Sequence, residues 1–243
     1  MMQQMIQTAV RLVYPPRCLG CGDLVESDFG LCAPCWRDTP FIGGTTCAAC
    51  GIPLQGPDDG HRIECDDCIA TPRPWRDGRA ALMYRDRARR IVLGLKHGDR
   101  ADLVQSAADW MARAGADILQ PGCLLAPVPL HWLRLARRRY NQSALLAQAL
   151  ARRTGLIACP DLLQRIRRTP TQDGLTATQR AENLTGAIRI HPRRAEMAQG
   201  ASVVLVDDVM TSGATLSACT HACLAAGANR VDVLVLARVG KDD

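Results

Sequence analysis

Aromatic side chains and lysine are both scarce in this 243-residue chain. There are four Trp, three Tyr and two Phe. Proteins that bind single-stranded nucleic acid without sequence preference commonly stack its bases on exposed rings. The aromatic residues nearest to the basic segments of this chain are Trp110, Trp132 and Tyr140. Because they are so few, the chain does not have the composition of a dedicated stacking platform. Lysine occurs only at positions 96 and 241, against 28 arginines, which points to a specific role for Lys96.

Long apolar stretches are missing as well. No segment has the length and hydrophobicity needed to span a membrane. The first 18 residues lack the basic start, the continuous apolar run and the small-residue cleavage site of a signal peptide. Residues 5–13 instead place apolar side chains on one face of a short helix, which the prolines at 15 and 16 stop. We therefore expect a cytoplasmic protein without membrane insertion.

The charge is distributed unevenly along the chain. Residues 1–75 hold 5 Lys and Arg against 9 Asp and Glu, whereas residues 76–243 hold 25 against 15. The net charges of these parts are therefore −4 and +10, which add to the +6 of the whole chain. The second part is expected to meet anionic partners, either phosphorylated metabolites or nucleic acid.

Cysteine, in contrast, is abundant. Eight of the twelve cysteines form four CxxC pairs before residue 70: Cys18 and Cys21, Cys32 and Cys35, Cys47 and Cys50, Cys65 and Cys68. Two CxxC turns supply the four thiolates of a tetrahedral zinc site, and a regular set of them in a cytoplasmic chain favours zinc over disulfides. The simplest assignment is sequential, with the first two pairs on one Zn²⁺ and the last two on another; a crossed pairing stays open. Because each site is complete with four thiolates, both are expected to be structural.

The zinc ribbons are not expected to bind a phosphate backbone, because this part of the chain is acidic and each four-thiolate site adds negative charge. Docking on the second domain or on a protein partner fits better. The other four cysteines, in apolar surroundings, are expected in the core, and His61 in solvent.

From about residue 78 onward, apolar runs alternate with helical patterns. Strands are predicted in 78–84, 123–130, 162–167, 187–190, 202–208 and 230–239, and helices in 85–96, 141–155 and 215–227. Strands that are apolar throughout, separated by helices, indicate an α/β fold with a parallel sheet covered on both faces. We expect residues 1–70 to form an N-terminal helix and a double zinc ribbon, residues 71–75 to be a linker, and the α/β domain to fill 71–243.

The stretch "VVLVDDVMTSGAT" (203–215) carries the chemistry. Asp207 and Asp208 come at the end of a buried strand, where ligands of such sheets bind. The residues that follow offer hydroxyls, a glycine and the start of a helix, which together suit a phosphate group: Thr211, Ser212, Gly213, Ala214 and Thr215. The two carboxylates suit the vicinal hydroxyls of a sugar, directly or through Mg²⁺. The stretch therefore predicts a site for a ribose 5-phosphate.

This stretch resembles the signature of type I phosphoribosyltransferases, which bind 5-phosphoribosyl 1-pyrophosphate (PRPP). More narrowly, the chain resembles the ComF family of competence-associated, phosphoribosyltransferase-like proteins. The resemblance rests on the CxxC ribbons and the signature together with "LKHGD", "PVPLHWLRLARRRYNQ" and "RRTPTQDGLTATQRAEN". It implies that Asp207 and Asp208, the candidate catalytic residues, hold the ribose hydroxyls, and that residues 211–215 hold the 5′-phosphate.

The resemblance also supplies candidates for the pyrophosphate end of PRPP. Residues 127–131 resemble the pyrophosphate loop, and 169–183 resemble a flexible loop that closes over PRPP. The candidate pyrophosphate and loop residues are Lys96, Val128, Pro129, His131, Arg137, Arg138, Arg167, Arg168 and Arg180. For His131, an ordinary loop position is an equal alternative. Arg139 departs from the family pattern, which commonly has glycine there, and this changes the backbone geometry expected at that position.

Three functions remain open. The chain is an active phosphoribosyltransferase with Mg²⁺ and an unknown acceptor, a PRPP-binding protein that handles single-stranded DNA, or a PRPP-responsive regulator acting through its zinc ribbons. Resemblance to competence proteins favours the second and implies DNA-uptake or recombination proteins as partners. Nine arginines against one acid in residues 131–168 also favour it, although PRPP itself or a solvated face accounts for several of them. No residue that would select an acceptor base is evident in the sequence.

Overall fold

The fold is built on a five-stranded parallel sheet. The computed structural model describes residues 15–28, 30–57, 60–97, 100, 102–130, 140–167 and 186–240. All neighbouring strands pair in parallel. In spatial order they are β1 (Gly78–Met83), β7 (Arg230–Arg238), β6 (Ser202–Met210), β2 (Leu124–Pro127) and β3 (Ile157–Ala158).

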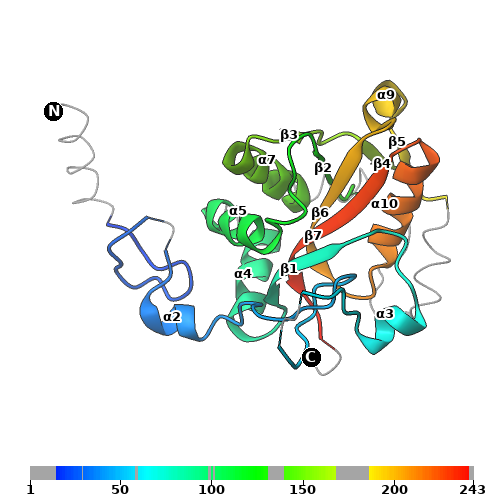
Figure 1. The fold of residues 1–243 in the computed structure, drawn as a ribbon. Coiled ribbons are helices and arrows are strands. Elements are labelled where there is room, and N and C mark those ends of the chain that lie inside the picture. Colours follow the sequence, from blue (N-terminus) through cyan, green and yellow to red (C-terminus); the bar gives the residue numbers. More distant parts are fainter. Residues whose placement is uncertain are drawn as a thin grey trace.

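Helices cover both faces of this sheet, as continuous apolar strands require. The helices α4 (Asp86–His97), α5 (Leu103–Ala114) and α7 (Gln142–Thr154) lie on one face, and α10 (Ala214–Ala225) lies on the other (Figure 1). The side chains of β6 alternate between them. Val204 and Val206 join the core under α5 and α7, whereas Val203 and Leu205 join the core under α10.

Besides the short helical segments in residues 192–198, two elements of the sheet domain are absent from the sequence prediction. The first is α5, although Leu103, Ala107 and Met111 recur at helical spacing on its buried side. The second is β3, which has two residues and forms the edge beside β2.

A separate antiparallel pair flanks the main sheet. Strand β4 (Leu163–Arg165) pairs with β5 (Ile188–Ile190), as the apolar runs on either side of the polar segment predict. The 3-10 turn η1 (Pro192–Arg194) and the short helix α9 (Ala195–Ala198) lead from there into β6. The segment 169–183, expected to be a closing loop, lies outside the described residues.

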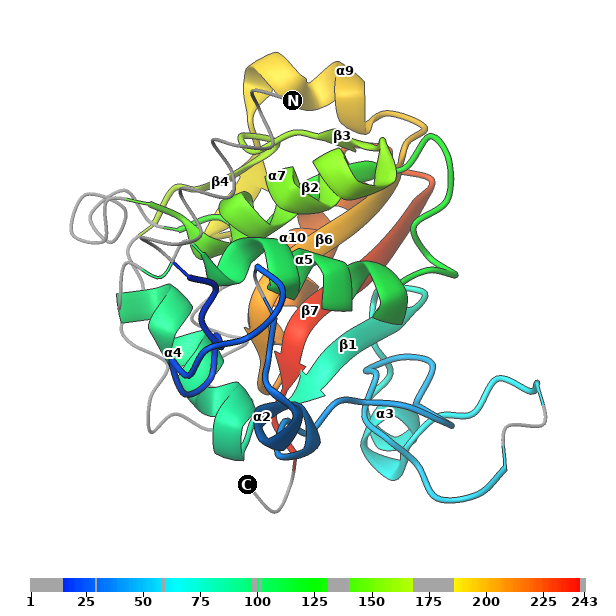
Figure 2. The same ribbon diagram turned by 90° about the vertical axis from the view of Figure 1, so that its left-hand side faces the viewer.

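The cysteine-rich part holds the short helices α2 (Ala33–Arg37) and α3 (Asp66–Ala70) and contacts the outer strand β1. The Ile42 N–H donates to Ala81 O at 2.9 Å, and the Met83 N–H donates to Pro40 O at 2.9 Å. These bonds cover the free edge of β1. In Figure 2 the chain from α2 runs past the end of β1 to α3.

None of the helices in the described ranges has the length and apolar character needed to cross a membrane.

Candidate functional site

The acidic pair lies within β6, at the point where β6 continues and the neighbouring strand β2 has ended. We expected the strand to end at Asp208, but it continues to Met210, paired with β7. On the other side, β2 ends at Pro127, opposite Val206. The pair therefore comes immediately beyond the end of β2.

Each carboxylate has a partner on a helix of the same face. Ser143 Oγ in α7 donates to Asp207 Oδ1 at 2.8 Å, and the Asp208 backbone N–H donates to the same oxygen at 2.9 Å. Lys96 Nζ in α4 lies 3.5 Å from Asp208 Oδ2. The scarce lysine singled out in the sequence is thus the cation next to the acidic pair.

The surroundings make Asp207 unusually hard to ionise. Burial, and then the negative charge of Asp208, raise the pKa of Asp207 to about 7, while the hydrogen bond from Ser143, the Asp208 N–H and the charge of Lys96 act in the opposite direction. A carboxyl group with a pKa near 7 gains its charge within the physiological pH range, so a cation or a hydroxyl-bearing ligand would bind this site with a marked pH dependence.

The loop after β6 has the form expected of a phosphate cradle. Gly213 has φ of +79°, a conformation that suits glycine, and α10 begins at the next residue, Ala214. A side chain at position 213 would meet the Trp75 ring, with its Cβ 3.0 Å from Cη2. Two arginines hold the carbonyl groups of this loop. Arg73 Nη1 donates to Ser212 O at 2.7 Å, and Arg238 Nη1 donates to Thr211 O at 2.8 Å.

Of the pyrophosphate-loop candidates, Val128 and Pro129 are buried beyond the end of β2. The Val128 N–H donates to Val206 O at 2.9 Å, so the start of this loop adjoins the residue before the acidic pair. Arg167 is exposed after β4. The other candidates, and Arg139 with its departure from the family pattern, lie outside the described residues: His131, Arg137, Arg138, Arg168 and Arg180 fall there.

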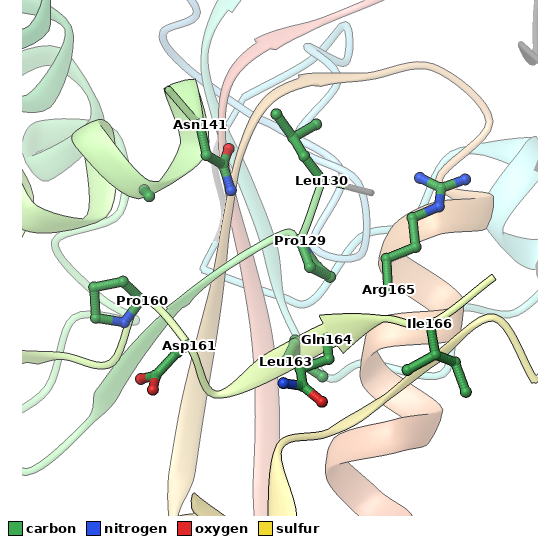
Figure 3. A pocket seen from close by; sticks show the side chains of 10 residues that line it. Pro129, Leu130, Asn141, Pro160, Asp161, Leu163, Gln164, Arg165 and Ile166 are labelled. Carbon is green, nitrogen blue, oxygen red and sulfur yellow. The ribbon is translucent and has the colours of Figure 1, made fainter. Parts of the chain in front are cut away.

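A cavity of about 550 Å³ opens between the end of β2, the start of α7 and β4. Figure 3 shows Pro129, Leu130 and Asn141 on one side of it and Gln164, Arg165 and Ile166 on the other. Its walls are mainly apolar, with two amides, a guanidinium and the carboxylate of Asp161. Neither Asp207 nor Asp208 lines it.

Residues 140–143 connect the parts of the site, a role that the sequence did not predict for them. Tyr140 Oη donates to Leu95 O at 2.9 Å, and Gln142 Nε2 donates to Lys96 O at 3.3 Å. Asn141 caps α7 by accepting from the Ser143 N–H, and its Nδ2 donates to Val128 O at 3.0 Å. The motif "RRYNQ" was a signal for this segment, but its role as a junction of α4, β2 and β6 depends on tertiary placement.

The eight CxxC thiols gather in two groups with the sequential arrangement. The sulfur atoms of Cys18, Cys21, Cys32 and Cys35 lie within 4.8 Å of one another, and so do those of Cys47, Cys50, Cys65 and Cys68. These two groups of four cysteines fit two zinc-ribbon sites. The four remaining cysteines, at positions 123, 159, 219 and 223, are buried as expected, and His61 is exposed.

The backbone around the thiols suits thiolate ligands. A hydrogen bond from the Cys50 thiol, assisted by the Cys65 N–H, lowers the pKa of Cys47 to about 4 although burial raises it. Burial also raises the pKa of Cys18, but backbone N–H groups, including those of Cys32 and Gly20, bring it down to about 6. One thiol of each group is thus favoured as a thiolate, whereas the pKa of Cys21, Cys35, Cys50 and Cys68 is raised. Zinc binds the thiolate form, so the other thiols lose their protons when the metal binds.

Comparison with known proteins places these features in a family. The family model of the double zinc ribbon domain matches residues 9–69, and that of the phosphoribosyl transferase domain matches residues 141–243. The chain is 32% identical to "DNA utilization protein YhgH" of Salmonella typhimurium, over 93% of this chain and 99% of that protein. It is 28% identical to "Competence protein F" of Haemophilus influenzae, over 91% of this chain and 96% of that one.

This chain belongs to the ComF family. A more distant relative is "Competence protein ComFC" of Bacillus subtilis, with 26% identity over 79% of this chain and 77% of that protein. The predicted architecture is confirmed. A parallel-sheet phosphoribosyltransferase fold follows a cysteine-rich double zinc ribbon.

Proposed function

We propose that this ComF-family protein binds PRPP with Mg²⁺ and displaces pyrophosphate from C1 of its ribose with a nitrogen nucleophile. The observation that carries the proposal is the acidic pair of β6, immediately before a glycine-containing loop that opens α10. Two carboxylates suit vicinal ribose hydroxyls, and the start of a helix suits a phosphate group. A ribose 5-phosphate offers both of these chemical groups in one molecule.

The three parts of PRPP then fall on three parts of the site. Asp207 and Asp208 hold the 2′- and 3′-hydroxyls, residues 211–215 hold the 5′-phosphate, and residues 128–130 lie toward the pyrophosphate. Carboxylate oxygens are ligands that Mg²⁺ prefers, so the acidic pair fits a Mg²⁺ that arrives with the substrate. When bound, Mg²⁺ would neutralise charge on the departing pyrophosphate. Lys96, held 3.5 Å from Asp208, supplies further positive charge.

Displacement at C1 passes through a transition state that resembles an oxocarbenium ion. The protein therefore contributes positioning and charge neutralisation more than covalent chemistry. Ser143, Asn141 and Gln142 serve the positioning, because their hydrogen bonds fix the acidic pair and the start of the pyrophosphate loop relative to α4.

The direct test is calorimetric titration of PRPP with Mg²⁺ into the protein, with release of pyrophosphate followed in the same samples. Binding supports the site, and release stimulated by an added nucleobase identifies the reaction class. Binding without release, with any base, leaves PRPP binding standing and contradicts turnover. Absence of binding contradicts the whole proposal.

PRPP affinity is expected to rise with pH between about 6 and 8. The carboxylate form of Asp207 accepts the ribose hydroxyl and attracts Mg²⁺, and its pKa of about 7 means that this form is lost as the pH falls. Below that pKa the affinity should fall by up to about tenfold per pH unit. Isothermal titration across this range, in buffers of different ionisation enthalpy, measures both the affinity and the protons released on binding.

The phosphate groups of PRPP also titrate near pH 6, so the pH profile needs a matched control. Asp207→Asn keeps the titration of the ligand and removes that of the protein. A profile of the variant as steep as that of the wild type would show that Asp207 does not set the pH dependence.

Removal of the Ser143 hydroxyl should move this pH profile. Its hydrogen bond stabilises the charged form of Asp207, so Ser143→Ala should raise the pKa of Asp207 further. A bond of this kind corresponds to about one pH unit. PRPP binding by the variant should be about fivefold weaker at pH 7 and recover at pH 8.5. A loss of affinity that is the same at every pH would indicate a merely structural role.

A second function is favoured by the names of the relatives, which refer to competence and DNA utilisation. In this alternative the protein handles single-stranded DNA in response to PRPP, using the basic segment 131–168. Binding of a single-stranded oligonucleotide should then weaken steeply with added salt and be competed away by PRPP. Sequence-specific binding to duplex DNA would contradict both functions.

A further inference from the structure

Arg73 contacts both the candidate phosphate loop and the second cysteine cluster, which is formed by Cys47, Cys50, Cys65 and Cys68. It lies in the segment 71–75, which we expected to be a linker. Its Nη1 donates to Ser212 O at 2.7 Å, across 139 residues of sequence. The same guanidinium interacts with the Cys68 thiol: it lowers the pKa of Cys68, while burial, the larger effect, raises it. One side chain therefore joins residue 212 to a cysteine of the second cluster.

Trp75 provides a second connection between the same two features. Its Nε1 donates at 2.6 Å to the carbonyl of Ala49, which lies inside the CxxC turn of Cys47 and Cys50. The ring is 4% exposed, and a Cβ on Gly213 would come within 3.0 Å of it. The Arg73 guanidinium lies 5.7 Å from the ring centroid. Segment 71–75 is thus packed between the second cluster and the loop.

The contacts of the first cysteine cluster lead elsewhere. Arg87 in α4 lies beside Gly20 and pairs with Asp38 at 3.5 Å. Arg100 donates to Leu19 O at 3.4 Å. Among the described residues these contacts go to α4 and the segment that follows it, not to the loop before α10.

Metal at the second cluster should therefore decide whether Arg73 and Trp75 are held in place. A zinc site with four cysteine ligands fixes its CxxC turns, and a small ribbon has little structure without metal. When Cys68 and Ala49 are no longer fixed, the loop loses two of its supports on that side. Binding a phosphate then requires ordering the loop, which lowers the affinity.

We propose that Arg73 is a positioning residue that makes the phosphate-binding conformation of residues 211–215 depend on metal at the second cysteine cluster but not at the first. This inference rests on one part of the proposed function, namely that residues 211–215 bind a phosphate group. It adds regulation to that site. Loss of zinc from the second cluster would weaken binding at the loop although no cysteine touches the ligand.

The test compares four variants of the full chain. Cys68→Ser breaks the second cluster, and Cys21→Ser is the matched change in the first. Arg73→Ala removes the connection and leaves every cysteine in place, and Arg76→Ala is its control at an exposed arginine three residues away. For each we would measure zinc per chain, hydrogen exchange of residues 211–215, and affinity for ribose 5-phosphate, which probes the loop without the pyrophosphate.

We expect Cys21→Ser to lose one zinc and leave loop exchange and affinity unchanged. Cys68→Ser should lose one zinc, accelerate loop exchange and weaken ribose 5-phosphate binding by about tenfold. Arg73→Ala should keep both zinc ions and show the same acceleration and weakening, while Arg76→Ala behaves like the wild type. The double variant Arg73→Ala with Cys68→Ser should show the same loop exchange and the same ribose 5-phosphate affinity as either single variant. Both changes break the same connection between the second cluster and the loop.

Wild-type exchange and affinity in Arg73→Ala would overturn the proposal, as would equal effects of the two cysteine variants. If Cys68→Ser fails to fold, the comparison of Arg73→Ala with Arg76→Ala still decides. A wild type that binds neither PRPP nor ribose 5-phosphate would refute the proposed function. Loop exchange would even then report whether Arg73 and the second cluster hold residues 211–215.

Discussion

Replacement of both Asp207 and Asp208 by Asn is expected to abolish PRPP binding while the fold stays intact. Each carboxylate would lose a hydrogen bond to a ribose hydroxyl and its attraction for Mg²⁺. A hydrogen bond to a charged group contributes about 1.5–3 kcal/mol, so the loss of two weakens binding at least a hundredfold. Calorimetric titration of PRPP with Mg²⁺ into the double variant measures this loss.

The fold should tolerate the change because ionised Asp207 is unfavourable in the native state. Its pKa is raised from 3.8 to about 7, so the folded protein binds this proton more tightly than the unfolded chain does. The resulting stabilisation is complete below about pH 3.8 and is lost as the pH rises through 7. At pH 8, Asp207→Asn should therefore be at least as stable as the wild type, and this advantage should shrink at pH 5. Thermal unfolding at the two pH values measures it.

The matched control for binding is an acid outside the site. Asp109, in α5, is partly exposed and pairs with Arg153 at 2.8 Å. Asp109→Asn should keep wild-type affinity for PRPP. Wild-type affinity in the folded double variant of Asp207 and Asp208 would show that the acidic pair does not hold the ribose.

All strands of the sheet domain except β3, and the helices α4, α7 and α10, could be predicted because local sequence determines them. Residues 203–206 and 233–237 are apolar without interruption, which is typical of strands buried on both faces. The helix α5 was missed although its periodicity was available. Three of its seven buried residues are alanine or serine, and Asp102 at its N-cap makes no capping hydrogen bond, so both its apolar pattern and its start signal were weak.

In the candidate site, too, the features set by local sequence could be predicted and those set by tertiary contacts could not. The acidic pair and the loop that follows it are contiguous, so one stretch of sequence describes them. The bond from Ser143 to Asp207 joins residues 64 apart, and the bond from Arg73 to Ser212 joins residues 139 apart. Such partners come together only through the order of strands in the sheet and the packing of the second ribbon against it. No local pattern marks Ser143 or Arg73 as part of a site.

Removal of zinc with a chelator is expected to unfold residues 18–68 before the sheet domain. The described part of the ribbons contains little regular structure beyond two five-residue helices, so the metal supplies much of their stability. The first ribbon should be lost before the second. Cys21 is exposed and Cys32 partly exposed, whereas Cys47, Cys50 and Cys68 are 0% exposed and belong to the core that includes Val233 and Val235.

Limited digestion with trypsin distinguishes these stages because each ribbon carries an arginine. The Arg37 side chain in α2 is 81% exposed, whereas Arg62 is held by ion pairs to Glu64 and Asp77. As zinc is withdrawn, cleavage after Arg37 should appear first and cleavage after Arg62 later, while β6 and β7 stay protected. Readdition of Zn²⁺ under reducing conditions should restore protection at both positions. A fully stripped protein that still resists trypsin at both arginines would mean that packing on β1 and the sheet, rather than metal, keeps the ribbons folded.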